Sequence, residues 1–514
     1  MNEMLDLAAA RTTEYIATMP KPLRKRYGQF FTSKETAAYM AGLFDEPEKK
    51  STISILDAGA GSGILSIALI ERLQKCTSLH SIHLVCYEND PNILDLLREN
   101  LEYAVNHSVV PLSYEIRSAN YILSQELEYN NMLCANPNLE EYDMVIGNPP
   151  YMKIPKDAPE AKAMPSVCYG APNMYFLFAA MGLFNLKSMG EMVYIIPRSW
   201  TSGAYFKQFR RSFLHDGSLE HIHLFVSRDK VFENENVLQE TIIIKVRKSV
   251  AKQRKIKITT SQSNQDFTDV TMFAAAYNTV VSNNADCFVY LITNAQEAET
   301  LETLNRLQNT LPSIGLKMKT GLTVDFRNRE ALRDGAEEKA VPLFYSQHIK
   351  GGKVVFPIGK QHEFIITNQS GLLQQNANYL FVKRFTSKEE PRRLQCGIYL
   401  ARKHPDYTKI STQNKINFIC GACELSECVV YGLYVLFNSS LYDCYYRILN
   451  GSTQVNSTEV NAMPVPSIDT IESMGKELIQ IRDMSESVCE QILRRHIYEQ
   501  DDGSQSHTKR IASA

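Results

Sequence analysis

The segment ISILDAGAGSGILSIALIERLQK (residues 53–75) decides the fold. Residues 53–59 form a short apolar run typical of a buried strand, and residues 64–75 carry apolar side chains at helical spacing. Glycines lie between them, where they let the backbone turn tightly and let a ligand approach the main chain. The segment therefore predicts a strand, a glycine-rich turn and a helix that together open a ligand-binding α/β sheet.

The alternation of strands and helices continues beyond this segment. Further strands are predicted at residues 83–90, 113–119, 142–150, 191–197, 219–226 and 241–248, and further helices at 91–104, 176–186 and 205–214. Strands separated by helices indicate an α/β fold with a doubly wound, mostly parallel, seven-stranded Rossmann-like sheet. No helix separates the last two strands, so we expect an antiparallel hairpin at one edge of the sheet.

The length of 514 residues predicts two to four domains at roughly 150 residues each. We expect a helical segment over 1–45, the α/β domain over 46–250, and a mixed α+β domain over 251–466. Residues 467–514 are expected to form a helix at 470–497 followed by a disordered tail. Residues 247–265 are basic and polar and are expected to form the connector. The net charge of −2 excludes a histone-like protein but allows a locally basic, nucleic-acid-binding face.

Other properties of the chain narrow its class. Apolar runs such as 429–437 fall short of the ~20 residues of a membrane span, and the first residues do not resemble a secretory signal. The 11 cysteines lack regular spacing and are expected to be reduced thiols. Cys420, Cys423 and Cys428 have no matching fourth ligand, so we expect buried thiols rather than a zinc site. We expect a cytoplasmic monomer without a metal.

Two carboxylates end the first two predicted strands. Asp57 begins the pattern D-x-G-x-G-x-G, which differs from the G-x-G-x-x-G of dinucleotide folds and suits a cationic or hydroxyl-bearing ligand. Glu88 ends the next strand, where a carboxylate can accept both hydroxyls of a ribose. The pair predicts a nucleoside-type cofactor such as S-adenosylmethionine. The alternative is an ordinary glycine-rich turn beside a solvated glutamate.

Asn148-Pro149-Pro150-Tyr151 follows the apolar strand DMVIG (143–147). The prolines stiffen the backbone and remove N–H donors, so the carbonyl groups are held rigidly. A carboxamide oxygen and a fixed carbonyl can each accept a hydrogen from one exocyclic amino group, and a tyrosine can stack on a planar base. The motif therefore indicates methylation of an amino group, although a proline-stiffened turn would have the same sequence.

These motifs, together with their order, resemble a known family. The segments are GQFFTS (28–33), DAGAGSG (57–63), YEND (87–90), SANY (118–121), GNPPY (147–151), NMYFLF (173–178), EMVYIIP (191–197) and VFENENVLQETIIIKV (231–246). In this order they are similar to the γ-class adenine-N6 DNA methyltransferases of type II restriction–modification systems, such as the TaqI methyltransferase. The resemblance is specific over about residues 24–250 and weaker near 313–466.

The resemblance implies a set of cofactor-binding residues for S-adenosylmethionine. Thr32, Asp57 and the glycines Gly59, Gly61 and Gly63 match the motifs around its methionine part. Glu88 matches the ribose carboxylate, and Asn89 the position beside the adenine ring. Asn120 stands where many relatives carry Asp for the amino group of that adenine. Phe178 matches the aromatic that packs on the adenine, although a plain core residue is an alternative.

The resemblance also implies the target-base residues. Asn148, Pro149 and Tyr151 match the catalytic motif, and Phe232 matches the aromatic on the other face of the base. A duplex adenine can reach such a pocket only by base flipping, and residues 152–172 are expected to form a mobile lid over it. The implied partners are double-stranded DNA and a separately encoded restriction endonuclease.

The region after the α/β domain resembles the target-recognition domains of the same proteins. Its basic residues Lys383, Arg384, Arg392 and Arg393, interleaved with Tyr379, Phe381 and Phe385, suit phosphate and base contacts, unless they form a solvated strand face. Two other functions stay open. N-P-P-Y also occurs in enzymes that methylate a protein glutamine or an RNA base, and a non-catalytic DNA-specificity module could keep this fold.

Overall fold

The computed structural model describes residues 3–18, 31–47, 50–131, 139–225, 241–387, 389–450 and 453–498. The chain forms two compact units, Met1–Ala295 and Gln296–Ala514. The change of domain therefore comes about 45 residues later than residue 250, where the sequence analysis expected it. Each unit is described separately below.

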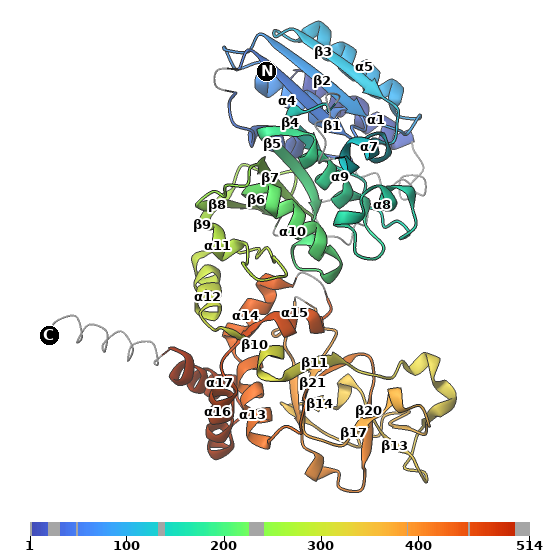
Figure 1. Ribbon diagram of the computed structural model, residues 1–514, viewed down its shortest axis with the longest axis vertical. Coiled ribbons are helices and arrows are strands. Elements are labelled where there is room, and N and C mark those ends of the chain that lie inside the picture. Colours follow the sequence, from blue (N-terminus) through green and yellow to red (C-terminus); the bar gives the residue numbers. More distant parts are fainter. Residues whose placement is uncertain are drawn as a thin grey trace, which may run out of the picture. The chain divides into compact units, whose positions relative to one another are not determined.

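A nine-stranded sheet forms the centre of the first unit, in the order β3-β2-β1-β4-β5-β7-β6-β8-β9 (Figure 1). Its strands are β1 (Thr52–Ala58), β2 (Ser81–Tyr87), β3 (Leu112–Arg117), β4 (Tyr142–Gly147), β5 (Leu186–Pro197), β6 (Gly217–Phe225), β7 (Thr241–Lys248), β8 (Lys255–Ser261) and β9 (Thr271–Ala276). The strands β3, β2, β1, β4 and β5 are parallel, and β7 is antiparallel to β5 and β6. The expected α/β sheet is confirmed, but its count of seven strands is wrong.

The expected hairpin of the last two strands exists but does not form an edge. β7 lies between β5 and β6, and β6 continues into a parallel pairing with β8, which pairs with β9. β8 falls in the stretch expected to be a connector. Ile256 and Ile258 are buried, whereas Lys255 and Lys257, which alternate with them, are exposed. This alternation has the period of a strand, and the high charge of the segment obscured it.

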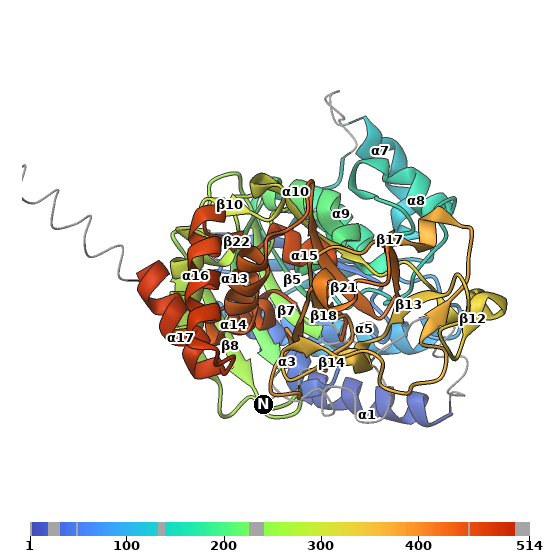
Figure 2. The same cartoon turned by 90° about the horizontal axis from the view of Figure 1, so that it is seen from below.

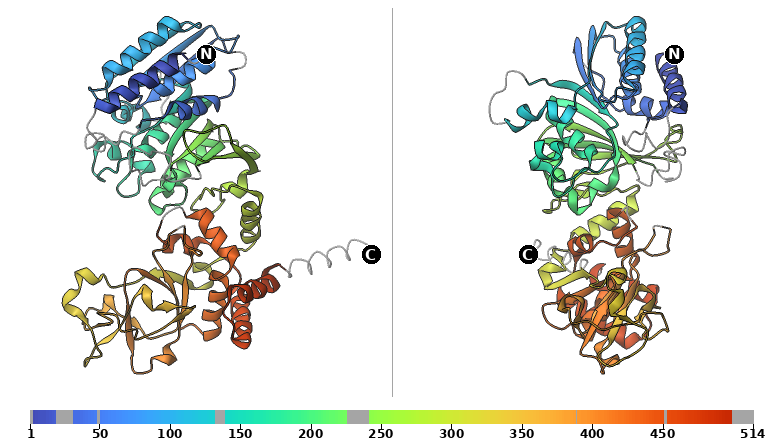
Figure 3. Two further views of the ribbon diagram at one scale, coloured as in Figure 1. Left: turned by 180° about the vertical axis from the view of Figure 1, so that it is seen from behind. Right: turned by 90° about the vertical axis from the view of Figure 1, so that its right-hand side faces the viewer.

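Helices cover both faces of the sheet. They are α1 (Glu3–Thr18), α3 (Lys34–Gly42), α4 (Ile64–Leu73), α5 (Leu94–His107), α6 (Tyr121–Ser124), α7 (Glu126–Asn130), α8 (Pro159–Ala163), α9 (Met174–Phe184), α10 (Lys207–Asp216) and α11 (Tyr277–Val280). α1, α3, α4 and α5 share a core with alternate residues of β1 and β4, and Figure 3 shows α1 and α5 side by side. Val145 of β4 and Tyr194 of β5 alternate with core residues of their strands and point to the other face, where they approach Gly182 of α9.

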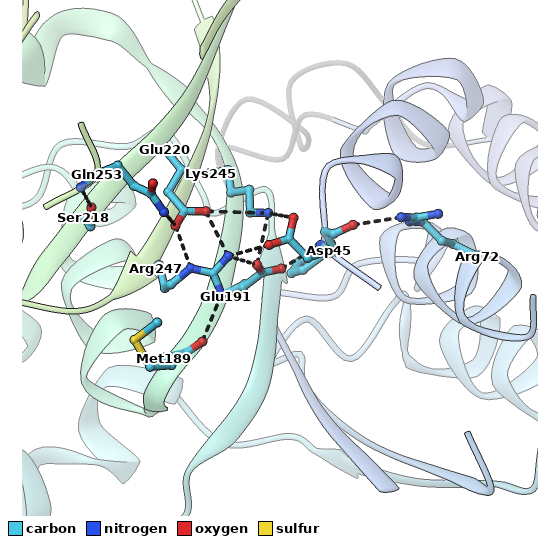
Figure 4. Close-up of polar contacts among 10 residues, drawn as sticks. Asp45, Arg72, Met189, Glu191, Ser218, Glu220, Lys245, Arg247 and Gln253 are labelled. Carbon is cyan, nitrogen blue, oxygen red and sulfur yellow. Dashed lines mark hydrogen bonds and ion pairs between the residues drawn. The ribbon is translucent and has the colours of Figure 1, made fainter. Parts of the chain in front are cut away.

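An ion-pair network anchors the chain that follows α3 to the strands β5, β6 and β7 (Figure 4). Lys245 Nζ lies 2.5 Å from Asp45 Oδ1 and 3.0 Å from Glu191 Oε1, and Arg247 Nε lies 2.6 Å from Glu220 Oε1. Although Asp45, Glu191 and Glu220 converge in the manner of metal ligands, the two cations already hold their oxygens. We therefore interpret the network as a structural anchor.

The second unit mixes short strands and helices. One sheet has the order β11-β21-β18-β19-β15-β14, another β12-β16-β13-β20-β17, and a third β10-β22. The strands are β10 (Asn309–Thr310), β11 (Leu316–Thr320), β12 (Leu332–Arg333), β13 (Val341–Phe344), β14 (Ile349–Lys350), β15 (Lys353–Val354), β16 (Phe364–Ile365), β17 (Gln374–Gln375), β18 (Tyr379–Lys383), β19 (Cys396–Tyr399), β20 (Lys409–Thr412), β21 (Ile416–Gly421) and β22 (Pro464–Val465).

The helices of the second unit lie mainly at its carboxyl-terminal end. They are α12 (Ala295–Asn305), which begins at the boundary, α13 (Glu427–Phe437), α14 (Ser440–Leu449), α15 (Ser457–Ala462), α16 (Ile468–Ile481) and α17 (Glu486–Leu493). α13, α16 and α17 pack against one another (Figure 2). The single helix expected at 470–497 is wrong, because Arg482 turns into the left-handed conformation (φ 62°) and ends α16. None of the helices within the described ranges could span a bilayer.

Candidate active site

The carboxyl ends of three neighbouring parallel strands meet at one edge of the first unit's sheet. In the register of the sheet, Asp57 of β1 pairs with Cys86 of β2 and with Ile146 of β4. The residues that follow each strand are therefore brought together, as is usual for ligand sites in open α/β sheets. They line a pocket, here called the Asn148 hollow, whose walls include Thr32, Gly59, Gly61, Glu88, Asn89, Asn148 and Phe178.

The glycine-rich turn forms one wall of this hollow. Gly59 and Gly61 have positive φ angles of 76° and 56°, which favour glycine, and a Cβ at Gly61 would meet nothing within 4 Å. The N–H of Gly59 donates to the oxygen of Tyr87 over 2.7 Å, which pins the turn to the end of β2. Gly63 has a different role, because a Cβ there would lie 2.8 Å from Leu97 Cδ1. We therefore assign Gly63 to packing between α4 and α5.

Glu88 lies at the centre of the site, and only 8% of its surface is exposed. Its Oε2 accepts from the N–H of Gly61 and its Oε1 from the N–H of Asp90, both over 2.8 Å. Burial raises the pKa of this carboxyl above its usual value. Each oxygen of an ionised carboxylate keeps a further lone pair, so the pinned side chain can also accept from ligand hydroxyls.

Asp57 is fully buried beneath the glycine-rich turn and is not among the residues that line the hollow. Its Oδ2 accepts from the hydroxyl of Ser66 over 2.6 Å. Its Oδ1 has no hydrogen-bond partner among the described residues. Burial raises the pKa of Asp57 to about 7, with a further contribution from the charge of Glu88. An unsatisfied, buried acceptor at this place fits a cationic ligand group, which would favour the ionised form.

A second hollow adjoins the first and shares Gly59, Glu88, Asn89, Pro150 and Phe178 with it. It is called here the Asn120 hollow, because Asn120 lines it and does not line the first. Phe178 of α9 is nearly buried and lies between the two. Asn148 lines only the first hollow. The shared Glu88 therefore stands between an end with Asn148 and an end with Asn120.

Asn148 is hydrogen-bonded on both sides. Its Nδ2 donates to the hydroxyl of Thr32 over 3.0 Å. The hydroxyl of Tyr151 lies 2.7 Å from Asn148 Oδ1 and 3.0 Å from the oxygen of Ile195. Tyr151 is buried and its ring packs edge-on against Tyr175, at 6.3 Å between centroids. In this structure the hydroxyl of Tyr151 therefore orients the carboxamide of Asn148. The ring of Tyr151 is buried, so neither of its faces is open for stacking on a base.

Of the other residues that the motifs predicted, the structure describes Pro149 but not Phe232. Pro149 is buried, and the neighbouring Pro150 lines both hollows instead. Phe232 and residues 28–30 lie outside the described residues. The segment 152–172 is closed at its base by two backbone bonds of 2.9 Å, from Ile154 to Pro172 and from Met174 to Met152. It carries the short helix α8.

Some lining residues were missed by sequence reasoning. Phe31, Pro150, Ile154 and Glu160 line one or both hollows. Phe31 and Pro150 lie inside the motifs GQFFTS and GNPPY, so their position next to predicted site residues could have identified them. Glu160 lies in the proline- and alanine-rich segment, which offered no periodicity and no motif to single it out.

The basic cluster expected to contact DNA is only partly exposed. Arg393 is fully buried, with its guanidinium over the ring of Tyr446 at 5.5 Å, and Arg392 pairs with Glu486 at 2.8 Å. Tyr379 and Phe381 are also buried core residues. This part of the prediction is wrong, because these side chains pack the second unit. Lys383, Arg384 and Phe385 remain at least partly exposed.

The three cysteines near residue 420 also differ from expectation. Cys423 is exposed, and Cys420 and Cys428 are half-buried, so they do not form the expected buried group. Cys420 lies on β21, where its thiol donates to the backbone oxygen of Lys317.

The sheet and its pocket define an open α/β domain with a ligand site at the carboxyl ends of its parallel strands. Residues 75–232 match the family described as Eco57I restriction-modification methylase. The chain is 34% identical to type II methyltransferase M.PstI of Providencia stuartii over 479 residues, which cover 90% of this chain and 91% of that one. It is also 34% identical to M.BsuBI of Bacillus subtilis, over 89% and 91% of the two chains.

A solved structure extends the likeness to the fold. The type IIL restriction-modification enzyme MmeI in complex with DNA matches 96% of this chain and 73% of its own, with a TM-score of 0.52 and 12% identity. The protein belongs to the type II DNA methyltransferases of restriction–modification systems. S-adenosylmethionine is accordingly its cofactor.

Proposed function

We propose that the protein transfers a methyl group from S-adenosylmethionine to N6 of an adenine in a specific sequence of double-stranded DNA. The observation that carries the proposal is the position of Asn148, which lines the same hollow as Glu88 and Phe178. The carboxamide that would bind the target amine thus lies beside the residues that would bind the cofactor.

The residues of the pocket fit this cofactor. The cleft is open at Gly61 and acidic at Glu88, and Asp57 lies buried beneath its glycine-rich turn with an unsatisfied oxygen. When bound, the cofactor supplies an electrophilic methyl group on a positively charged sulfur. Ionised carboxylates near that charge stabilise the bound form.

Asn148 and Pro149 would act on the target amine. The oxygen of Asn148 and the backbone carbonyl of Pro149 can each accept one hydrogen of the amino group, which directs the nitrogen lone pair toward the methyl carbon. Thr32 supports this function because its hydroxyl holds the nitrogen side of the Asn148 carboxamide at 3.0 Å. A hydrogen-bond acceptor that is already positioned before the reaction is a major source of rate enhancement in enzyme active sites.

The adenine must leave the duplex to reach Asn148. We keep Phe232 as the expected aromatic on one face of the extruded base. Tyr151 would stack on the other face only after its side chain turns outward from its buried position. Until then its hydroxyl orients Asn148.

On the DNA side, we propose that the second unit recognises the target sequence. Lys383, Arg384 and Phe385 are the members of the predicted cluster available for phosphate and base contacts. We further propose a cytoplasmic monomer whose cognate endonuclease is encoded separately, so that methylation protects the host DNA.

Expression in a methylation-deficient bacterium tests the function. Sequencing that detects modified bases should find N6-methyladenine at one short sequence throughout the genome. The Asn148→Ala variant should leave the DNA unmodified. Modified cytosines, or labelled protein or RNA in place of labelled DNA, would contradict the proposal and support the other classes of N-P-P-Y enzyme.

A further inference from the structure

Glu160 is a carboxylate of the Asn120 hollow that no motif assigns. It is half-buried on α8 and lines the hollow together with Gly59, Asn120 and Phe178. Its Oε1 accepts a hydrogen bond of 2.8 Å from Asn120 Nδ2. A carboxylate and a carboxamide thus stand side by side at the end of the cleft away from Asn148.

The two partners of Asn120 determine which way its carboxamide points. Its Oδ1 accepts from the N–H of Leu123 over 3.2 Å and so caps α6, while its Nδ2 faces Glu160. A backbone N–H can only donate and an ionised carboxylate can only accept, so the oxygen must face Leu123. The oxygen of Asn120 is therefore directed toward the cap of α6, and Glu160 supplies a charged acceptor at this end of the cleft.

The order of residues along the cleft places the base of the cofactor near Glu160. Glu88 lines both hollows, Asn148 only the first, and Glu160 only the second. A nucleoside whose ribose lies on Glu88, and whose reactive methyl group points toward Asn148, directs its purine into the Asn120 hollow. Phe178, Ile154 and Pro150 line that hollow and give it apolar walls for a planar ring.

An adenine ring buried there carries an amino group that needs a hydrogen-bond acceptor. Hydrogen bonds to an ionised acceptor are stronger than those to a neutral one. We propose that Glu160 recognises the amino group of the cofactor's adenine, and that Asn120 holds Glu160 in position. This inference rests on the proposed function, since it assumes that the cofactor lies in this cleft.

The segment that carries Glu160 is held from several sides. Besides the two backbone bonds at its base, Asn130 Nδ2 donates to the oxygen of Ala163 over 3.1 Å, and the hydroxyls of Tyr129 and Ser166 lie 3.2 Å apart. α8 is therefore attached to α7 as well as to the strand ends. A carboxylate on a supported element can select its ligand better than one on a free loop.

Calorimetric titration of two ligands tests the proposal. The ligands are S-adenosylhomocysteine and its analogue in which hydrogen replaces the purine amino group. Glu160→Ala should weaken binding of S-adenosylhomocysteine about tenfold or more, and should change binding of the analogue less than about twofold. Asp157→Ala removes an exposed carboxylate of the same segment and is the matched control, for which we expect no change with either ligand. Asn120→Asp combined with Glu160→Ala should recover part of the loss, because Asp offers a second oxygen beside the cap.

Equal losses for both ligands in Glu160→Ala would overturn the proposal and assign Glu160 to the packing of α8. Unchanged binding of S-adenosylhomocysteine would overturn it as well. Failure of the underlying function is distinguishable, because the wild-type protein would then bind neither ligand, or Glu88→Ala would bind S-adenosylhomocysteine as tightly as the wild type. Either result would remove both proposals.

Discussion

Polar side chains at the strand ends of the first unit line an open pocket, whereas in the second unit the basic residue Arg393 lies in the core and Arg392 is half-buried in an ion pair. Glu88 and Asn148 follow parallel strands whose carboxyl ends meet at one edge of the sheet. Arg392 and Arg393 lie between β18 and β19, against α14 and α17. A polar residue at the carboxyl end of a parallel strand is therefore a good predictor of a ligand site. Basic residues that lie close together in the sequence do not by themselves predict an exposed surface.

The largest expected effect is a difference in stability between alanine variants of two arginines of the second unit, Arg393 and Arg384. Arg393→Ala removes a buried guanidinium from Tyr446 and Thr386 and should lower the free energy of unfolding by about 3 kcal/mol. Arg384→Ala should cost about 1 kcal/mol or less and should weaken DNA binding instead. Thermal unfolding and DNA titration of both variants measure the contrast. Equal stability of the two variants would mean that Arg393 is not a core residue.

Buried histidines in the first unit predict a pH-dependent stability. The hydroxyl of Thr259 lies 2.7 Å from His221 Nε2 and 2.9 Å from His223 Nδ1. Burial lowers the pKa of His221 to about 4 and of His223 to about 3. In the unfolded chain both protonate near pH 6.5, so folding stability falls as the pH drops below that value.

The expected loss is about 1–2 kcal/mol for each histidine between pH 6.5 and pH 5. Denaturant unfolding at several pH values measures it. The double variant His221→Gln/His223→Gln should show a smaller slope with pH, while His215→Gln, which changes an exposed histidine, should keep the wild-type slope. A double variant with the wild-type slope would show that other groups cause the dependence.

A smaller effect tests Asp57 as part of the cofactor site. Because its pKa is about 7, protonation below pH 7 removes a negative charge beside the cleft. Affinity for S-adenosylmethionine should then fall by up to tenfold, about 1.4 kcal/mol, for each pH unit below 7. In Asp57→Asn the affinity should be weaker at pH 7.5 and should depend less on pH. If the affinity of Asp57→Asn still depended steeply on pH, the titrating group would be Glu88 and not Asp57.

The smallest expected effect concerns the hydroxyl of Tyr151. Tyr151→Phe loses a hydrogen bond of about 1 kcal/mol that orients Asn148, so the rate of methyl transfer should fall about fivefold. Tyr205→Phe, at an exposed position of the same unit, is the control. An unchanged rate in Tyr151→Phe would leave stacking as the function of this residue.

Much of the first unit could be predicted from the sequence because strand ends and glycine turns follow local rules. The strands β1 to β7 and the pocket residues Glu88, Asn148 and Phe178 lie where the pattern indicated. β8 was not predicted because its exposed lysines Lys255 and Lys257 alternate with the buried isoleucines and conceal their pattern. Glu160 escaped because only the folded chain brings α8 next to Asn120, 40 residues away. Arg393 was misread because its burial depends on α14, which comes 47 residues later in the sequence.

The central claim is that Asn148 binds the target amine beside the bound cofactor, and a single-turnover measurement tests it most directly. Asn148→Ala is mixed with S-adenosylmethionine and with unmethylated duplex DNA that contains the recognition sequence, and the methylated product is followed over time. The account predicts a methyl-transfer rate about 10²–10³-fold below wild type, with cofactor and DNA affinities nearly unchanged. Asn131→Ala, at an exposed asparagine, should retain the wild-type rate. An Asn148→Ala enzyme that methylates adenine at the wild-type rate would contradict the account.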